Sequence, residues 1–188
     1  MPWLEGKAAN TYTQFGEDGL IDAVFERIGT TTRQCFEVGA ADGLFFSNTL
    51  RLREQGWSAV LIEKDIGRWQ KLHDAYSSEQ VQCLLGTVTD LDRALRFSQY
   101  RHEKRPDLGV IDVDGQDYWL WLGMIDYRPR VMLVETDPSD WQAIPPRNEP
   151  GQAGLAAIKQ VGTSKGYTLV AHTYCNALFV DSAVLAEL

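Results

Sequence analysis

The chain has 188 residues, 44% of them hydrophobic and 23% charged, and a formal net charge of −8. This size and composition are typical of one globular domain with a substantial core. The acidic balance disfavours nucleic acid as a partner, because binding to a phosphate backbone depends on clustered Lys and Arg. No apolar run approaches the roughly 20 residues of a membrane span, and the N-terminus carries no signal pattern. We therefore expect no membrane partner and a cytoplasmic location.

The first predicted element is an amphipathic helix over residues 19–28, where apolar side chains recur at helical spacing. We expect residues 1–30 to form a helical segment that packs on the domain. Strand patterns follow at residues 34–38, 58–62, 81–85, 108–113 and 130–135. Helical patterns separate them at residues 48–55, 66–76, 90–99 and 117–125.

The last part of the chain predicts a hairpin. After a proline-rich loop at residues 145–151 come a helix at 153–161 and two apolar runs at 167–172 and 177–180. The link between these runs is too short for a parallel crossover. The preceding alternation of strands and helices predicts a parallel sheet covered on both faces. The predicted fold is α/β: a Rossmann-like, doubly wound, mostly parallel seven-stranded sheet with an antiparallel C-terminal strand, in a single domain over residues 1–188.

Three cysteines, Cys35, Cys83 and Cys175, lie apart from one another in apolar runs. An odd number of cysteines without C-x-x-C spacing argues against a disulfide framework. We expect all three to be buried thiols.

The most informative stretch is Cys35-Phe36-Glu37-Val38-Gly39-Ala40-Ala41-Asp42-Gly43, in which an apolar run with an acid at its end leads into a glycine turn. Glu63 ends the next strand, where an acid can accept both hydroxyls of a ribose. Ala41 and Asp42 stand where the dinucleotide pattern needs glycine and a neutral residue, and a carboxylate there would repel a pyrophosphate. The implied ligand is a nucleoside without phosphates and with a positive charge, which fits S-adenosylmethionine (SAM).

Seven short motifs resemble those of the FkbM-like group of class I methyltransferases. They are Thr13-Gln14-Phe15-Gly16-Glu17-Asp18-Gly19, Phe36-Glu37-Val38-Gly39-Ala40-Ala41-Asp42-Gly43, Asn48-Thr49-Leu50, Gly56-Trp57, Ile62-Glu63, Ile111-Asp112-Val113-Asp114-Gly115-Gln116-Asp117-Tyr118 and Asn176-Ala177-Leu178-Phe179-Val180. The resemblance covers nearly the whole chain and implies a SAM-binding Rossmann-like fold with methyl transfer, commonly to an oxygen of a sugar or another small metabolite. Two positions depart from the family pattern: Ala41 replaces a second glycine, and Asp137 stands where an asparagine is expected.

On this interpretation Glu37 receives the ammonium group of the cofactor, and Glu63 binds the ribose hydroxyls. Either acid can also be a simple strand-end residue. Residues 87 and 88 follow the third strand, where this fold usually meets the adenine ring, although an ordinary turn explains them almost as well. Asp42 and Asn48 can equally cap helices. The predicted cofactor-binding residues are Glu37, Gly39, Ala40, Asp42, Gly43, Asn48, Glu63, Thr87, Val88 and Asp112.

The predicted catalytic residues are Asp114, Asp112 and Glu135, which follow or end central strands. Acids at the carboxyl ends of parallel strands face the crevice in which such sheets bind ligands. Because a strand alternates its faces, Asp112 and Asp114 are expected to point the same way. One of them can accept a proton from the acceptor hydroxyl, while its neighbour raises the pKa of that carboxyl group.

The same acids, together with Asp137, allow a shared Mg²⁺ ion. Their spacing is a weak metal signal, so no residue is assigned as a metal ligand. His172 is expected to be a core histidine rather than a base, and Trp119 and Trp121 to be core residues. Trp141 is a candidate substrate contact, and the loop at residues 145–151 is either a cover over the acceptor pocket or a linker.

Three functions fit these observations. The first is an enzyme that transfers the SAM methyl group to a hydroxyl group of a small polar acceptor. The second is an NAD-dependent oxidoreductase, which the altered glycine turn disfavours. The third is a SAM-binding module without turnover, because the short chain leaves little material for an acceptor pocket. A homo-oligomer is compatible with all three.

Overall fold

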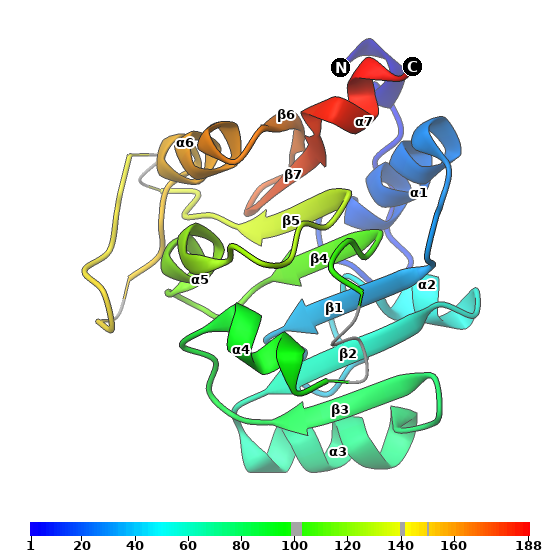
Figure 1. Cartoon of the computed structure of the whole chain (residues 1–188), viewed down its shortest axis with the longest axis vertical. Helices are drawn as coiled ribbons and strands as arrows, with labels where there is room; N and C mark the ends of the chain where they lie inside the picture. Colours follow the sequence, from blue (N-terminus) through cyan, green and yellow to red (C-terminus); the bar gives the residue numbers. More distant parts are fainter. Residues whose placement is uncertain (99–102, 140–141, 150) are drawn as a thin grey trace.

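The computed structural model describes residues 1–98, 103–139, 142–149 and 151–188, and it contains one seven-stranded sheet (Figure 1). The strand order is β3-β2-β1-β4-β5-β7-β6. Every neighbouring pair is parallel except those of β7, which runs antiparallel to both β5 and β6. The predicted α/β fold with an antiparallel C-terminal strand is thus confirmed. The strands are β1 (Gln34–Val38), β2 (Ser58–Glu63), β3 (Val81–Leu85), β4 (Leu108–Ile111), β5 (Val131–Glu135), β6 (Tyr167–His172) and β7 (Asn176–Asp181).

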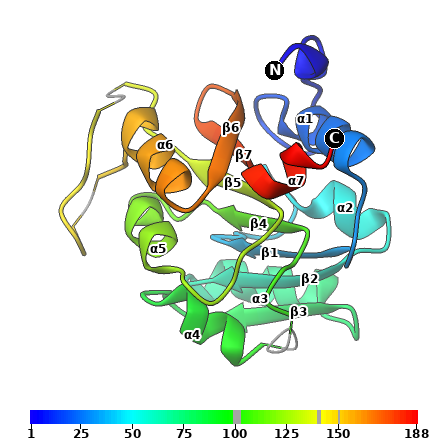
Figure 2. The same cartoon turned by 45° about the horizontal axis from the view of Figure 1, so that its top comes forward.

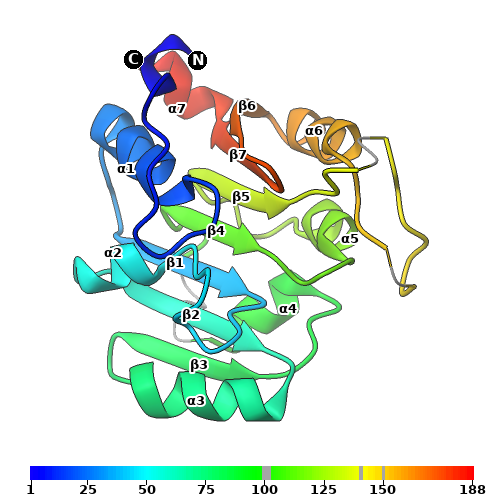
Figure 3. The same cartoon turned by 180° about the vertical axis from the view of Figure 1, so that it is seen from behind.

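Helices cover both faces of the sheet. Figure 3 shows α1, α2 and α3 on one face, and Figure 1 shows α4, α5 and α6 on the other. The helices are α1 (Glu17–Ile28), α2 (Leu50–Glu54), α3 (Ile66–Tyr76), α4 (Leu91–Arg96), α5 (Asp117–Gly123), α6 (Leu155–Ser164) and α7 (Ser182–Ala186), after a 3₁₀ turn at Pro2–Leu4. Among the described residues, no helix combines the length and apolar character that crossing a bilayer requires.

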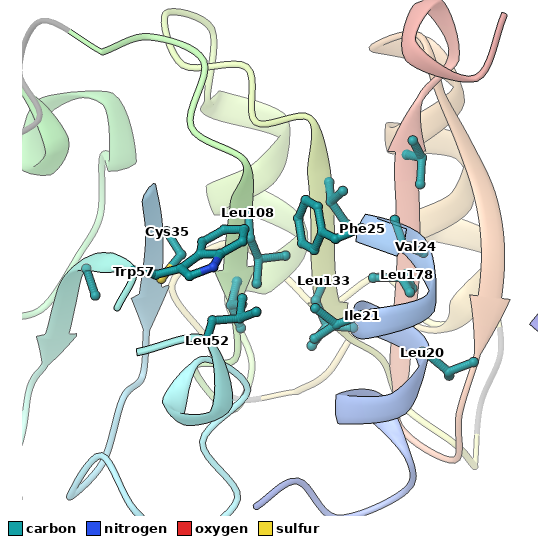
Figure 4. Close-up of a cluster of buried hydrophobic side chains, with 14 of the residues drawn as sticks. Leu20, Ile21, Val24, Phe25, Cys35, Leu52, Trp57, Leu108, Leu133 and Leu178 are labelled. Carbon is teal, nitrogen blue, oxygen red and sulfur yellow. The ribbon is translucent and has the colours of Figure 1, made fainter. Parts of the chain in front are cut away.

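Two buried apolar clusters hold these layers together. In the first, Ile21, Val24 and Phe25 of α1 pack against side chains of the sheet (Figure 4). The ring of Phe25 meets that of Trp57 edge to face, with 5.0 Å between the ring centroids. The second cluster lies under α4, α5 and α6 and includes Trp121, which is fully buried. The apolar periodicity of α1 thus identifies the face that packs on the sheet.

Several elements are shorter than their sequence patterns predict, and the differences matter at the carboxyl ends of the strands. β4 ends at Ile111, not at residue 113, and Asp114 has a left-handed φ of +57°. Strand alternation therefore does not apply to Asp112 and Asp114 as expected, although one carboxyl oxygen of each still lies within 4.8 Å of the other. The N-cap aspartates at 65 and 90 accept amide hydrogen bonds from residues 68 and 93, which sets where α3 and α4 begin.

The loop between β5 and α6 extends away from the sheet (Figure 2). Its described part is held at the start of α5: Gln116 donates to the carbonyl oxygen of Glu149 at 2.8 Å and accepts from the amide of Asn148 at 2.9 Å. Trp119 is only partly buried and belongs to neither apolar cluster, so the expectation of a core residue is wrong for it. Its indole donates to the carbonyl oxygen of Pro145 at 2.9 Å. Trp141, predicted as a substrate contact, lies outside the described residues.

Candidate functional site

A cavity of about 310 Å³ lies at the carboxyl ends of the parallel strands. Parallel topology brings these ends to one edge of the sheet, so residues far apart in sequence meet there. Of the residues predicted from sequence, ten line this cavity: Glu37, Gly39, Ala40, Asn48, Glu63, Thr87, Val88, Asp112, Asp114 and Glu135.

Glu37 is nearly completely buried, with 2% of its surface exposed. Its carboxylate accepts hydrogen bonds from the hydroxyl of Ser47 at 2.9 Å, the amide of Asn48 at 2.8 Å and the hydroxyl of Thr49 at 2.6 Å. These three donors lie in the segment between the glycine turn and α2. Glu37 therefore fixes the conformation of this segment as well as contributing a negative charge to the cavity.

Two predicted cofactor contacts, Asp42 and Gly43, lie outside the cavity lining. The carboxylate of Asp42 accepts from the amides of Leu44 and Phe45 at 3.0 and 3.1 Å, so it stabilises the turn. Gly43 faces α3: a Cβ atom there would lie 2.4 Å from Cδ1 of Leu72. Asp42 and Gly43 therefore belong to the motif because the turn requires them, and they do not line the cavity.

Glu63 connects the end of β2 to the glycine turn. Its carboxylate accepts from the amide of Ala41 at 2.8 Å and from the amide of Asp65 at 2.7 Å, and only 4% of its surface is exposed. A carboxylate has about four acceptor positions, so two remain for a ligand. Beside it the cavity is lined by Lys64 and Arg68, and by residues 86–88 after β3.

Three carboxyl groups meet at the ends of β4 and β5. One oxygen atom from each of Asp112, Asp114 and Glu135 lies within 4.8 Å of the others. Burial, with the charge of Glu135 as the second cause, holds the pKa of Asp112 well above its ordinary value. Burial and the neighbouring charges of Asp117 and Asp114 raise the pKa of Glu135 to about 7. At neutral pH the cluster therefore retains protons that isolated carboxyl groups would lose.

Other predicted members of this region have different surroundings. Asp137 is not part of the three-carboxylate cluster, and its side chain accepts from the amide and hydroxyl of Ser139. Asp117 accepts from the amides of Val113 and Gly115, while burial raises the pKa of its carboxyl group to about 6. His172 is exposed and lies outside the cavity lining, so the expectation of a core histidine is wrong. Its ring nitrogen Nε2 is 3.2 Å from the hydroxyl of Thr136.

The cavity also contains residues that were not predicted. Cys175 lines it and is half-buried, in contrast to the buried Cys35 and Cys83, so the expectation of three buried thiols is wrong for Cys175. Burial, with the charge of Glu135 as the second cause, raises the pKa of its thiol to about 12. Further lining residues outside the predicted set include Gln14, Phe45, Phe46, Gln116 and Asn176.

Three of these additions lie in motifs that are visible in the sequence: Gln14 in the first, Gln116 in the sixth and Asn176 in the last. Their positions in those motifs were the available signal, but local patterns do not show that the first and last segments meet. Phe45 and Phe46 are exposed, at 69% and 56%, beside the cavity. Apolar side chains at such an opening can contact a ligand.

Neither a protein-family model nor a curated protein matches the chain. Solved structures are similar to it. An O-methyltransferase from Bacillus cereus in complex with SAH is 15% identical, with a TM-score of 0.58, over 86% of this chain and 78% of that chain. A protein assigned as an O-methyltransferase from Klebsiella pneumoniae is 14% identical, with a TM-score of 0.58, over 93% of this chain and 83% of that chain.

A protein assigned as a sarcosine dimethylglycine methyltransferase from Galdieria sulphuraria is also similar, at 14% identity and a TM-score of 0.55. The match covers 82% of this chain but only 62% of that protein, so it spans less than two thirds of the longer chain. At these identities the comparisons show the fold: a seven-stranded Rossmann-like sheet that methyltransferases share.

Proposed function

We propose that the chain is a SAM-dependent methyltransferase that transfers the methyl group to a hydroxyl group of a small polar acceptor, such as a sugar. One observation carries this proposal: a single cavity contains Glu63 beside the glycine turn at one end and the three-carboxylate cluster at the other. The structural neighbours support the same class of cofactor, since one of them was solved with SAH. The resemblance of the seven motifs makes the FkbM-like group the proposed family.

We assign the following roles in cofactor binding to residues that line the cavity. Glu63 accepts the ribose hydroxyls, and residues 87 and 88 contact the adenine. Glu37 and Asp112 face the positively charged end of the cofactor, where the two carboxyl groups offset the sulfonium and ammonium charges. A bound cation lowers the pKa values of neighbouring carboxyl groups. SAM would therefore convert the protonated cluster to a more ionised one.

Methyl transfer is a displacement at carbon, so the acceptor oxygen must lie in line with the bond that breaks. The protein then contributes mainly orientation and exclusion of water. In this proposal Asp114 and Glu135 receive the proton that the acceptor hydroxyl loses. A Mg²⁺ ion on the same three carboxylates is the alternative way to bind and polarise that hydroxyl, and their mutual distances fit one cation.

An NAD-dependent oxidoreductase is the weaker candidate. The amide of Ala41 already donates to Glu63, which places a carboxylate where a pyrophosphate would need free amide donors. Calorimetric titration with SAM and with NAD separates the two: we expect SAM to bind and NAD to leave no measurable heat. Release of S-adenosylhomocysteine during incubation with a metabolite extract then separates an enzyme from a SAM-binding module. Tight NAD binding without SAM binding would overturn the proposal.

A further inference from the structure

The first and last of the seven motifs meet beside the cavity, although they stand at opposite ends of the sequence. The carboxylate of Glu17 accepts hydrogen bonds from the hydroxyl of Thr173 at 2.6 Å and from Nδ2 of Asn176 at 3.1 Å. Gln14 and Asn176 both line the cavity. The proposed methyl transfer assigns no role to this contact.

Glu17 fixes the orientation of the Asn176 amide. Because a carboxylate only accepts hydrogen bonds, the NH₂ group must face it, and Oδ1 must lie on the other side. Asn176 is 5% exposed, and its Oδ1 has no hydrogen-bond partner among the described residues. Buried amide oxygens are normally paired, so an unpaired one in a residue that lines a cavity points to a donor group supplied by a ligand.

The charges around Asn176 restrict the chemistry of that ligand. Asn176 is paired in register with Glu135 across β5 and β7, and Asp112 and Asp114 lie in the same three-carboxylate cluster. The only Lys or Arg side chains in the described lining are Lys64 and Arg68, which follow β2 on the other side of β1, β4 and β5. A phosphate or carboxylate at the Asn176 end would meet acids, with no Lys or Arg side chain of the described lining there to offset its charge.

We propose that Asn176, positioned by Glu17, binds a hydroxyl or amino group of the methyl acceptor, and that this acceptor is a neutral or cationic polyol. The inference rests on the proposed methyl transfer and adds to it the class of acceptor. An amino sugar satisfies both requirements, since it carries several hydrogen-bond donors and a positive charge. A sugar phosphate does not.

The test uses three probes: D-glucosamine, methyl α-D-glucopyranoside and glucose 6-phosphate. Calorimetry first gives the affinity of wild type, Asn176→Leu and Thr173→Val for S-adenosylhomocysteine. Thr173→Val is the matched control, because it removes the other hydrogen bond to Glu17 but Thr173 does not line the cavity. The probes are then titrated against each isotope-labelled protein saturated with S-adenosylhomocysteine, and amide resonances report binding.

We expect both uncharged and cationic probes to bind wild type, with the affinity for D-glucosamine falling about tenfold or more in Asn176→Leu. Thr173→Val should remain close to wild type, and glucose 6-phosphate should not bind. If Asn176→Leu does not fold, Asn176→Ala replaces it.

Unchanged D-glucosamine affinity in the folded variant would overturn the role of Asn176. Binding of glucose 6-phosphate to wild type would overturn the selection by charge. Failure of both D-glucosamine and methyl α-D-glucopyranoside to bind wild type would also overturn it. Failure of S-adenosylhomocysteine to bind would instead count against methyl transfer. The D-glucosamine affinities of wild type and Asn176→Leu are then compared in the absence of S-adenosylhomocysteine.

Discussion

A Cβ atom at position 39 would lie 1.6 Å from the carbonyl oxygen of Asp112, so the turn after β1 and the chain after β4 meet backbone to backbone. Gly39 also has a φ of +87°, a value that L residues with side chains rarely adopt. Position 39 therefore requires glycine for the fold itself. The contact with the chain after β4 is a reason for glycine that the local sequence pattern does not show.

We expect Gly39→Ala to lower the free energy of unfolding by at least about 2 kcal/mol, because the added methyl group must displace Asp112 and because the positive φ is costly. Gly86→Ala is the matched control. Gly86 also lines the cavity, but a Cβ atom there has no heavy atom within 4 Å. Urea unfolding of both variants checks the prediction. A Gly39→Ala protein as stable as wild type would contradict the backbone contact.

The strand ends and their acids were predictable because apolar periodicity identifies strands, and parallel topology brings the carboxyl ends of those strands together. Glu37, Glu63, Asp112 and Glu135 all follow from this reasoning. The contact between Glu17 and Asn176 did not, since it joins residues 159 positions apart. No local pattern specifies which distant polar side chains will pair.

The direction of a side chain after a strand was equally beyond the sequence. Alternation applies only while the backbone stays extended, and Asp114 has already left the strand with a left-handed φ. Its carboxylate still approaches Asp112 and Glu135, but it does so through the turn and not through strand geometry. Asp42 differs in the other direction. It lies in the motif that predicts a ligand site, but its carboxylate accepts hydrogen bonds only from amides of the same turn.

Glu63→Ala is expected to weaken SAM binding by about 1 to 3 kcal/mol, because it removes the ribose acceptor and leaves the amide of Ala41 without its carboxylate. Asp42→Ala is the comparison, since Asp42 belongs to the same turn region but does not line the cavity. Its effect on SAM affinity should stay below about 0.5 kcal/mol. Calorimetry on variants shown to be folded by circular dichroism decides the matter. Equal losses of affinity would mean that Glu63 acts only by holding the turn.

Asp114→Asn should keep SAM affinity within a factor of a few and lower turnover by roughly 10² to 10⁴, the range for loss of a positioned base. Asparagine tolerates the left-handed backbone of Asp114, so this substitution changes the charge without adding strain. Turnover is followed as release of S-adenosylhomocysteine from SAM in a metabolite extract that serves as the source of acceptors. A variant with normal turnover would remove Asp114 from the chemistry.

Chelation distinguishes the proton acceptor from a metal ligand in the same cluster. We expect EDTA to leave wild-type turnover unchanged, because a hydroxyl that attacks a sulfonium methyl group needs a local proton acceptor more than charge neutralisation. Loss of turnover with EDTA and recovery with Mg²⁺ would instead assign Asp112, Asp114 and Glu135 to a cation. The assay and the source of acceptors are those used for Asp114→Asn.

Glu135 should make the ligand-free protein less stable as the pH rises from about 4.5 to 7. Its pKa is raised from 4.5 to about 7 in the folded state, so the folded protein binds more protons than the unfolded chain across this window. Glu135→Gln stays neutral and lacks this dependence. We expect the free energies of unfolding of Glu135→Gln and wild type to differ least near pH 4. By pH 7.5 the variant should be more stable relative to wild type by up to about 3 kcal/mol. Urea unfolding at each pH measures the difference, with Glu26→Gln, a substitution at an exposed residue, as the control. A Glu135→Gln curve parallel to wild type would show that this carboxyl group ionises in the folded protein as readily as in the unfolded chain.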